Sequence, residues 1–112
     1  MPSAEVMPVL VQAAQTDSSE KVRRSAILGL DKIGTVEAVS ILVKVAQTDP
    51  DAFNRQLTVN IIGRLKSAEV VLVLATVAQM DLDEDVRFAA VENLRKINTP
   101  TAIKALLRLN SQ

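Results

Sequence analysis

The hydrophobic positions of this chain recur with the period of an α-helix. In the first third of the sequence, the residues that share one side of a helical wheel, at about 100° per residue, are Val22, Ala26, Gly29, Leu30 and Ile33. Near the other end, the same places hold Val86, Ala90, Asn93, Leu94 and Ile97. We expect these stripes to form the core. No segment shows a sustained alternation with a period of two, so the pattern predicts helices and no strands.

The sequence repeats itself every 32 residues. The element Ala-Gln-Thr-Asp or Ala-Gln-Met-Asp marks the repeat at 14–17, 46–49 and 78–81. The units that this spacing defines are 3–34, 35–66 and 67–98, with a half unit at 99–112. A period of this length is typical of solenoid proteins, in which stacked units share a continuous core. We therefore predict a single repeat domain over residues 1–112.

Each unit has the pattern of two antiparallel helices, which we term helix A and helix B. A hydroxyl residue that can cap the first turn stands at the expected start of every helix A: Ser3, Thr35, Ser67 and Thr99. The corresponding caps of helix B are Ser19, Asp51 and Asp83. We expect the B helices to end near Gly34, Lys66 and Asn98. The prediction is an all-α solenoid of seven helices in antiparallel pairs, made of three repeats and a terminal half repeat.

Two stretches share an acidic turn, a Val-Arg pair and small apolar residues followed by Leu: residues 17–43, DSSEKVRRSAILGLDKIGTVEAVSILV, and residues 81–103, DLDEDVRFAAVENLRKINTPTAI. In these features they resemble the short HEAT-like repeat named after phycocyanobilin lyase subunits. The second unit departs from the pattern with Asn54 in place of Val and Lys66 in place of Gly, and we expect Phe53 to supply the missing apolar contact. The resemblance implies a right-handed α-solenoid whose B helices line a concave, protein-binding surface. Lyase-type members of the family help to attach bilins to phycobiliproteins.

The segment DLDEDVRFAAVE at residues 81–92 has acidic side chains at its first, third, fifth and twelfth positions. This is the ligand spacing of a helix–loop–helix calcium site. The sixth position of such a loop normally holds glycine, because the chain turns sharply there, but here it is Val86 of the core stripe. Acidic residues also cap and stabilise the start of a helix. We therefore interpret the segment as a helix start and expect it to bind no metal.

Three arginines occupy the same position in successive units, at the edge of the core stripe: Arg23, Arg55 and Arg87. A guanidinium in that place can form two hydrogen bonds to a carboxylate, or bond to loop carbonyls, of an adjacent unit. The acids that recur with the same spacing are Asp17, Asp49 and Asp81. A structural ladder of such pairs is our main interpretation. The alternative is a row of arginines that binds anions or phosphates.

Composition narrows the chemistry that the chain can perform. Its 112 residues include no Cys, His, Trp or Tyr, which removes the thiol nucleophile, the commonest general base and most stacking platforms. Lys and Arg number 13, as do Asp and Glu, so no net charge attracts nucleic acid or an anionic membrane. The longest apolar run, 70–75, is too short to span a bilayer, and the N-terminus does not resemble a signal peptide. We expect no catalytic residue, cofactor or metal, no nucleic-acid or membrane partner, and a cytoplasmic location.

A binding surface is expected where the units differ, because packing does not dictate those positions. The strip on the side of helix B opposite the core includes Gly63 and the eight residues that we predict to bind a protein: Arg24, Leu28, Asp31, Gln56, Asn60, Phe88, Glu92 and Arg95. Leu28 and Phe88 are apolar where contact with solvent is expected, which suits interface anchors. The alternative is that they are scattered exposed residues without a role.

The outer side of helix A offers a second candidate contact. Leu72 and Thr76 stand there in place of Ser40 and Lys44 of the preceding unit. Leu72, like the terminal helices, is a candidate for weak self-association. The sequence as a whole favours a non-catalytic interaction module or scaffold that binds another protein on its concave face. The alternative function is an accessory subunit of a bilin lyase, or another phycobiliprotein-associated factor.

Overall fold

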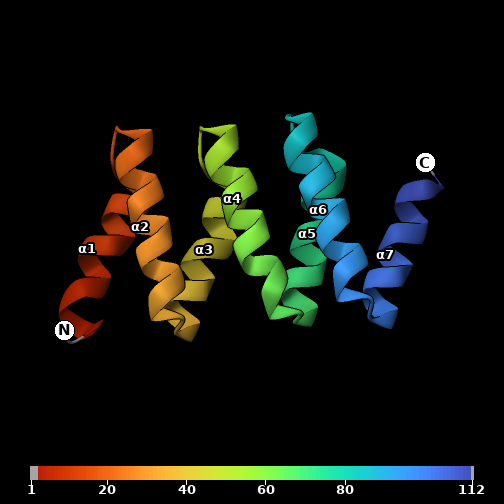
Figure 1. Ribbon diagram of the computed structural model, residues 1–112, viewed down its shortest axis with the longest axis horizontal. Coiled ribbons are helices and arrows are strands. Elements are labelled where there is room, and N and C mark those ends of the chain that lie inside the picture. The colour runs from red at the N-terminus through yellow and green to blue at the C-terminus, as the bar shows by residue number, and fades with distance from the viewer. Residues whose placement is uncertain (1–2, 112) are drawn as a thin grey trace.

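The computed structural model describes residues 3–111, with side chains from Glu5 onward, and contains seven α-helices (Figure 1). In chain order these are α1 (Ser3–Thr16), α2 (Glu20–Ile33), α3 (Val36–Thr48), α4 (Ala52–Ile62), α5 (Ala68–Met80), α6 (Glu84–Ile97) and α7 (Pro100–Asn110). A short 3-10 helix, η1 (Gly63–Leu65), follows α4. No strand occurs between residues 3 and 111, so the prediction of an all-α fold is confirmed.

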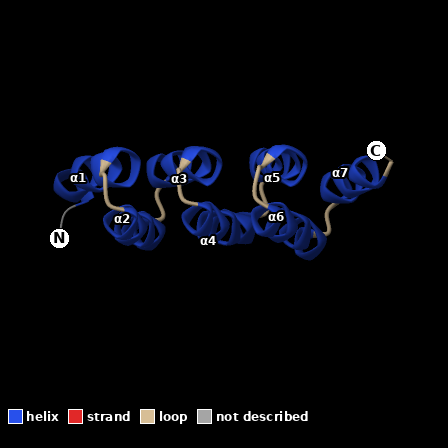
Figure 2. Cartoon of the chain, turned by 90° about the horizontal axis from the view of Figure 1, so that it is seen from above, coloured by secondary structure: helices blue, strands red, loops and turns tan. Residues whose placement is uncertain are grey.

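The helices lie in two rows (Figure 2). One row holds the predicted A helices α1, α3, α5 and α7, and the other holds the B helices α2, α4 and α6. Each A helix of a complete unit packs against its own B helix, and each pair lies beside the next along the molecule. The result is an elongated shape of 45 × 24 × 14 Å. This arrangement confirms the prediction of a solenoid of helix pairs.

The predicted caps explain where most of the helices begin. At the A helices the capping hydroxyls belong to Thr35, Ser67 and Thr99, and each accepts a hydrogen bond of 3.2 Å from the backbone N–H three residues later. At the B helices the capping side chains are those of Ser19, Asp51 and Asp83. These six predictions are confirmed. Ser3 is the first residue of α1 rather than its cap, and its side chain lies outside the described residues.

The ends of the B helices follow the sequence equally closely. Gly34, Lys66 and Asn98 take the left-handed conformation, with φ of 65°, 58° and 52°. Glycine adopts this conformation without steric cost, and asparagine does so more readily than most residues. In the second unit α4 gives way to η1 at Gly63, and Lys66 ends that turn instead.

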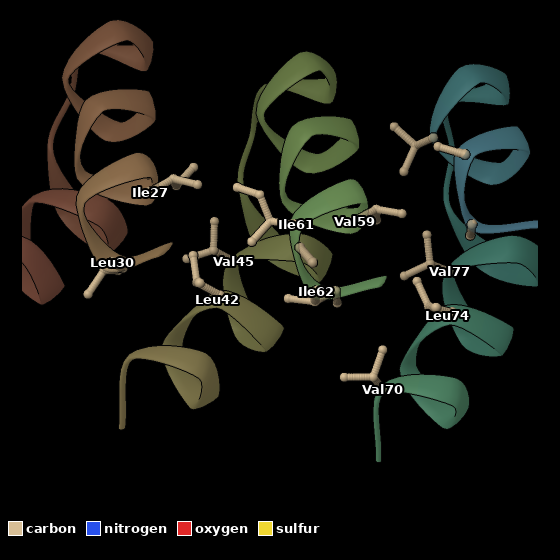
Figure 3. Packing of buried hydrophobic residues seen from close by; sticks show 14 of the residues in the cluster. Ile27, Leu30, Leu42, Val45, Val59, Ile61, Ile62, Val70, Leu74 and Val77 are labelled. Carbon is tan, nitrogen blue, oxygen red and sulfur yellow. The ribbon is translucent and has the colours of Figure 1, made fainter. Parts of the chain in front are cut away.

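The core fills the space between the two rows (Figure 3). Leu30, Ile62 and Leu94 stand at equivalent positions of the three B helices, and all are fully buried. Leu42 of α3 and Leu74 of α5, in the A row, are buried in the same core. The stripe predicted for α6, from Val86 to Ile97, is buried at every position.

The first unit departs from the predicted core at Val22. This residue is exposed, whereas Asn54 and Val86 at the same position of later units are fully buried. Asn54 shows why, because its side chain lies against α2 of the preceding unit and donates to the carbonyl of Glu20 at 3.0 Å. Among residues 3–111 no earlier B helix stands beside α2, so nothing covers Val22. The prediction that Val22 belongs to the core was therefore wrong.

The second unit also corrects the role predicted for Phe53. Its ring is largely exposed and does not replace an apolar core contact. Asn54 itself occupies the core position where the repeat expects valine, and its Oδ1 accepts a hydrogen bond of 2.8 Å from Arg24 Nε. A buried amide is tolerated when its polar atoms are paired. A polar contact between units therefore takes the place of the expected valine.

Candidate interaction surfaces

Arginine–aspartate pairs join successive units along the chain. Arg23 Nε and Nη2 donate to the Asp49 carboxylate at 3.0 and 3.3 Å, and Nη1 donates to the carbonyl of Asp17 at 2.9 Å. Arg55 repeats this arrangement one unit later, on the Asp81 carboxylate at 3.0 and 3.1 Å and on the carbonyl of Asp49 at 2.8 Å. Each arginine thus bonds to the loop of its own unit and to the acid of the next. The predicted structural ladder is confirmed for these two residues.

The third arginine completes only half of the pattern. Arg87 Nη1 donates to the carbonyl of Asp81 at 2.7 Å, but no carboxylate within residues 5–111 pairs with its guanidinium. At the other end, the Asp17 side chain accepts from the backbone N–H of Ser19 at 2.9 Å and holds the loop between α1 and α2. Arg23 and Arg55 already bind carboxylates, which argues against a row of arginines that binds anions.

The carboxylates of the ladder also shape the loops. Asp49 Oδ1 accepts from the backbone N–H of Asp51 at 2.8 Å, so one carboxylate both turns the chain and binds Arg23. The hydrogen bond to Asp49 raises the pKa of Arg23 above its ordinary value. The backbone N–H of Asn54 donates to Asp51 and lowers the pKa of that carboxyl. Both groups are therefore held in their charged forms by contacts that the fold requires.

Three of the eight predicted binding residues take part in contacts between units. The guanidinium of Arg24 bonds to Asn54 and lies 4.6 Å from the centre of the Phe53 ring. Asp31 Oδ2 lies 3.0 Å from Arg64 Nη2 in an ion pair that is largely open to solvent. Asn60 Oδ1 accepts a hydrogen bond of 2.8 Å from Asn93 Nδ2. The expectation that packing leaves these three positions free was wrong.

The other five predicted residues remain available on the outer side of the B helices. Leu28 and Phe88 are exposed as predicted, with 65% of the surface of Phe88 open to solvent. Gln56 and Glu92 are half-buried. Arg95 is exposed, and its Nη1 lies 3.4 Å from Oε1 of Glu92, one turn earlier on α6. Gly63, which the sequence also placed in this strip, is buried instead, because the side chain of Asn93 from α6 packs onto it.

Phe53 belongs to the same surface, although the sequence reasoning assigned it to the core. Its ring is 57% exposed on α4, and the guanidinium of Arg24 lies over it. The repeat itself indicated that Phe53 is exposed. The equivalent residues of the other units, Lys21 and Asp85, are charged, and a core position would not hold charged side chains. Both phenylalanines of the chain are thus exposed on B helices.

Comparison with known families agrees with this architecture. A family model described as HEAT repeats matches residues 1–60 and, in a second match, residues 44–111. The chain belongs to the HEAT repeat family. HEAT repeats commonly serve as protein-interaction scaffolds and are generally non-catalytic. No curated protein matches the chain.

The segment at residues 81–92 is the junction between the two helices of the third HEAT unit. Asp81 ends α5 and binds Arg55, Asp83 caps α6, and Val86 is fully buried in the first turn of that helix. The interpretation as a helix start is confirmed. Within the described residues, no group of three or more acidic side chains is arranged to hold a metal ion, and no helix is long and apolar enough to cross a membrane.

Calcium should leave the melting temperature of this HEAT-repeat chain unchanged. A ligand raises the stability of a fold only by binding its native state more tightly than the unfolded chain, and here Asp81 and Asp83 are already engaged. Thermal unfolding followed by circular dichroism, with and without Ca²⁺, measures this. A saturable upward shift at millimolar calcium or below, absent from an Asp83→Asn variant, would contradict the expectation.

Proposed function

We propose that this HEAT-repeat chain is a non-catalytic interaction module that binds a partner protein on the face formed by α2, α4 and α6. The observation that carries the proposal is that Leu28, Phe53 and Phe88 are all exposed on these three helices. Aromatic side chains are enriched among the residues that dominate binding energy, and they bring a large apolar area at low entropic cost. Nothing in the internal packing requires either ring to face solvent.

The polar residues of this face suit the edge of such an interface. Arg24 is fixed over Phe53 by its bond to Asn54, so the ring and the cation form a rigid pair. Near Phe88, Glu92 and Arg95 supply both signs of charge on the same helix. Charges at the edge of an interface contribute little affinity but set orientation and the rate of association. A partner with an apolar ridge flanked by mixed charges would complement this surface.

The narrower alternative, an accessory subunit of a bilin lyase, rests on the sequence resemblance alone. It requires the chain to promote attachment of a bilin to an apo-biliprotein. Visible absorbance after incubation of the chain with a bilin and an apo-biliprotein would test it directly. The scaffold proposal predicts no such absorbance from this chain alone.

A Phe88→Ala variant should lose most of its captured partner while melting close to the wild type. A central aromatic anchor contributes more than about 2 kcal/mol to binding, whereas removal of a ring that is 65% exposed leaves the core intact. The measurement is affinity capture from the native lysate with mass spectrometry, in parallel with thermal unfolding. Leu72→Asp on α5 is the matched control, because Leu72 is equally exposed but lies in the A row. Normal capture by the Phe88 variant, together with loss of capture by the Leu72 variant, would place binding on the other face.

A further inference from the structure

A groove opens between α5 and α7 on the A-helix side of the molecule. It has a volume of about 420 Å³, and its lining includes Val71, Leu72, Ala75 and Ala105. A volume of this size lies within the range of ordinary binding pockets, and a mostly apolar lining is typical of them. Figure 2 shows α7 beside α5 at the end of the A row. The groove is thus separate from the B-helix face.

Two small residues explain why the groove is hollow. Ala75 of α5 and Ala105 of α7 line it, and the equivalent residues between α3 and α5 are Val43 and Val73. Both valines pack against the core. The pocket that remains between α3 and α5 is smaller, at about 150 Å³, and neither valine lines it. The small side chains of Ala75 and Ala105 therefore contribute to the larger hollow between α5 and α7.

The rim of the groove on the α7 side is basic. Lys104 and Arg108 lie one helical turn apart, are exposed, and both line the groove. Within residues 5–111, neither forms an ion pair with a carboxylate. A binding partner that presents an apolar side chain next to carboxylates would complement both the apolar lining and the basic rim of the groove.

The same chain carries an apolar side chain of that kind. Leu82, in the loop between α5 and α6, is 95% exposed and stands between Asp81 and Asp83 in the sequence. Glu84 and Asp85 follow it on the first turn of α6, are exposed, and form no ion pair with the described residues. The other units hold Ser18 and Pro50 in place of Leu82. We term Leu82, Glu84 and Asp85 the acidic knob. The first unit shares only the glutamate, as Glu20, and the second unit shares none of the three, so the full set occurs in the third unit alone.

We propose that the groove between α5 and α7 binds the acidic knob of a second copy of this chain. Leu82 of one copy enters the apolar groove of the other, and Glu84 and Asp85 pair with Lys104 and Arg108. Shape and charge are complementary on the two surfaces, and every copy carries both. Contact in both directions closes a dimer, and contact in one direction builds an open chain.

Charge reversal on each side tests the proposal by rescue. The groove variant is Lys104→Glu with Arg108→Glu, and the knob variant is Glu84→Lys with Asp85→Lys. Wild-type chain should associate reversibly at high micromolar to millimolar concentration in sedimentation equilibrium. Either variant alone should associate at least about tenfold more weakly, because like charges then face each other. An equal mixture of the two variants should recover association, since each groove then meets a knob of opposite charge.

Two further variants separate this contact from loss of fold. Ala75→Val with Ala105→Val restores the packing found between α3 and α5, so it should fill the groove and weaken association while the helical content is retained. Lys44→Glu on α3 reverses an exposed charge away from the groove, and it should associate like the wild type. A wild-type chain that stays monomeric at millimolar concentration overturns the proposal. So does a mixture of the two charge-reversed variants that associates no better than either alone.

Discussion

Replacing Arg55 with alanine is expected to lower the free energy of unfolding by about 2–4 kcal/mol. The side chains of Arg55 and Asp81 are only 13% and 6% exposed, so the carboxylate would be left largely buried without its cation. One remaining hydrogen bond, from the backbone N–H of Asp83 at 2.9 Å, cannot replace two bonds from a guanidinium. Urea unfolding followed by circular dichroism measures the loss.

Arg87→Ala is the matched control for that experiment. Arg87 occupies the same position one unit later and keeps the bond to its own loop, at 2.7 Å from the carbonyl of Asp81. Since no carboxylate of residues 5–111 pairs with it, its removal should cost less than about 1 kcal/mol. The difference between the two variants isolates the ion pair between units. Equal losses would show that the carboxylate contributes nothing to stability.

Gly63→Ala is expected to destabilise the fold by about 1–3 kcal/mol, although alanine normally favours a helix. Gly63 has an ordinary helical φ of −60°, so the backbone would accept a side chain. The obstacle is Asn93 of the next unit, whose Oδ1, Cγ and Cβ would lie 2.1, 2.5 and 3.0 Å from the added Cβ. Asn93 cannot move freely, because its Nδ2 donates to the carbonyl of Ala89 and to Asn60 Oδ1, both at 2.8 Å. Thermal or urea unfolding gives the size of the effect.

The same substitution should cost much less when most of the obstacle is removed. In an Asn93→Ala background the Oδ1 and Cγ atoms are gone and only the Cβ contact at 3.0 Å remains, so Gly63→Ala should cost less than about 1 kcal/mol. The comparison is a double-mutant cycle on the two positions. If Gly63→Ala costs the same in both backgrounds, the contact with Asn93 is not what requires glycine.

Much of the fold could be read from the sequence because every unit repeats the same local rules. Caps such as Thr35 and Asp51 and the left-handed end at Gly34 are fixed by neighbours a few residues away, which the sequence displays directly. The arginine ladder was foreseen because Arg23 and Asp49 recur at the same spacing. Its direction was not foreseen, since a helical wheel does not tell which neighbouring unit lies on which side.

The surface was harder to predict because it depends on how units meet. Asn60 and Gly63 looked like free positions, yet both contact Asn93, which belongs to the next unit of the sequence. Val22 looked like core because its equivalents in later units are covered by a preceding B helix. Phe53 could have been found by comparing it with Lys21 and Asp85 in the same register. The groove between α5 and α7 brings together Ala75 and Ala105 from two different units, so no pattern within one helix indicates it.

Site-specific photo-crosslinking tests the proposed binding face most directly. A benzophenone amino acid is placed at Phe88 on α6 in one variant and at Leu72 on α5 in another, and each is irradiated in the native lysate. We expect the Phe88 position to form an adduct with another protein, and the Leu72 position to form adducts only with a second copy of the chain. A foreign protein that crosslinks to the Leu72 position and never to the Phe88 position would contradict it.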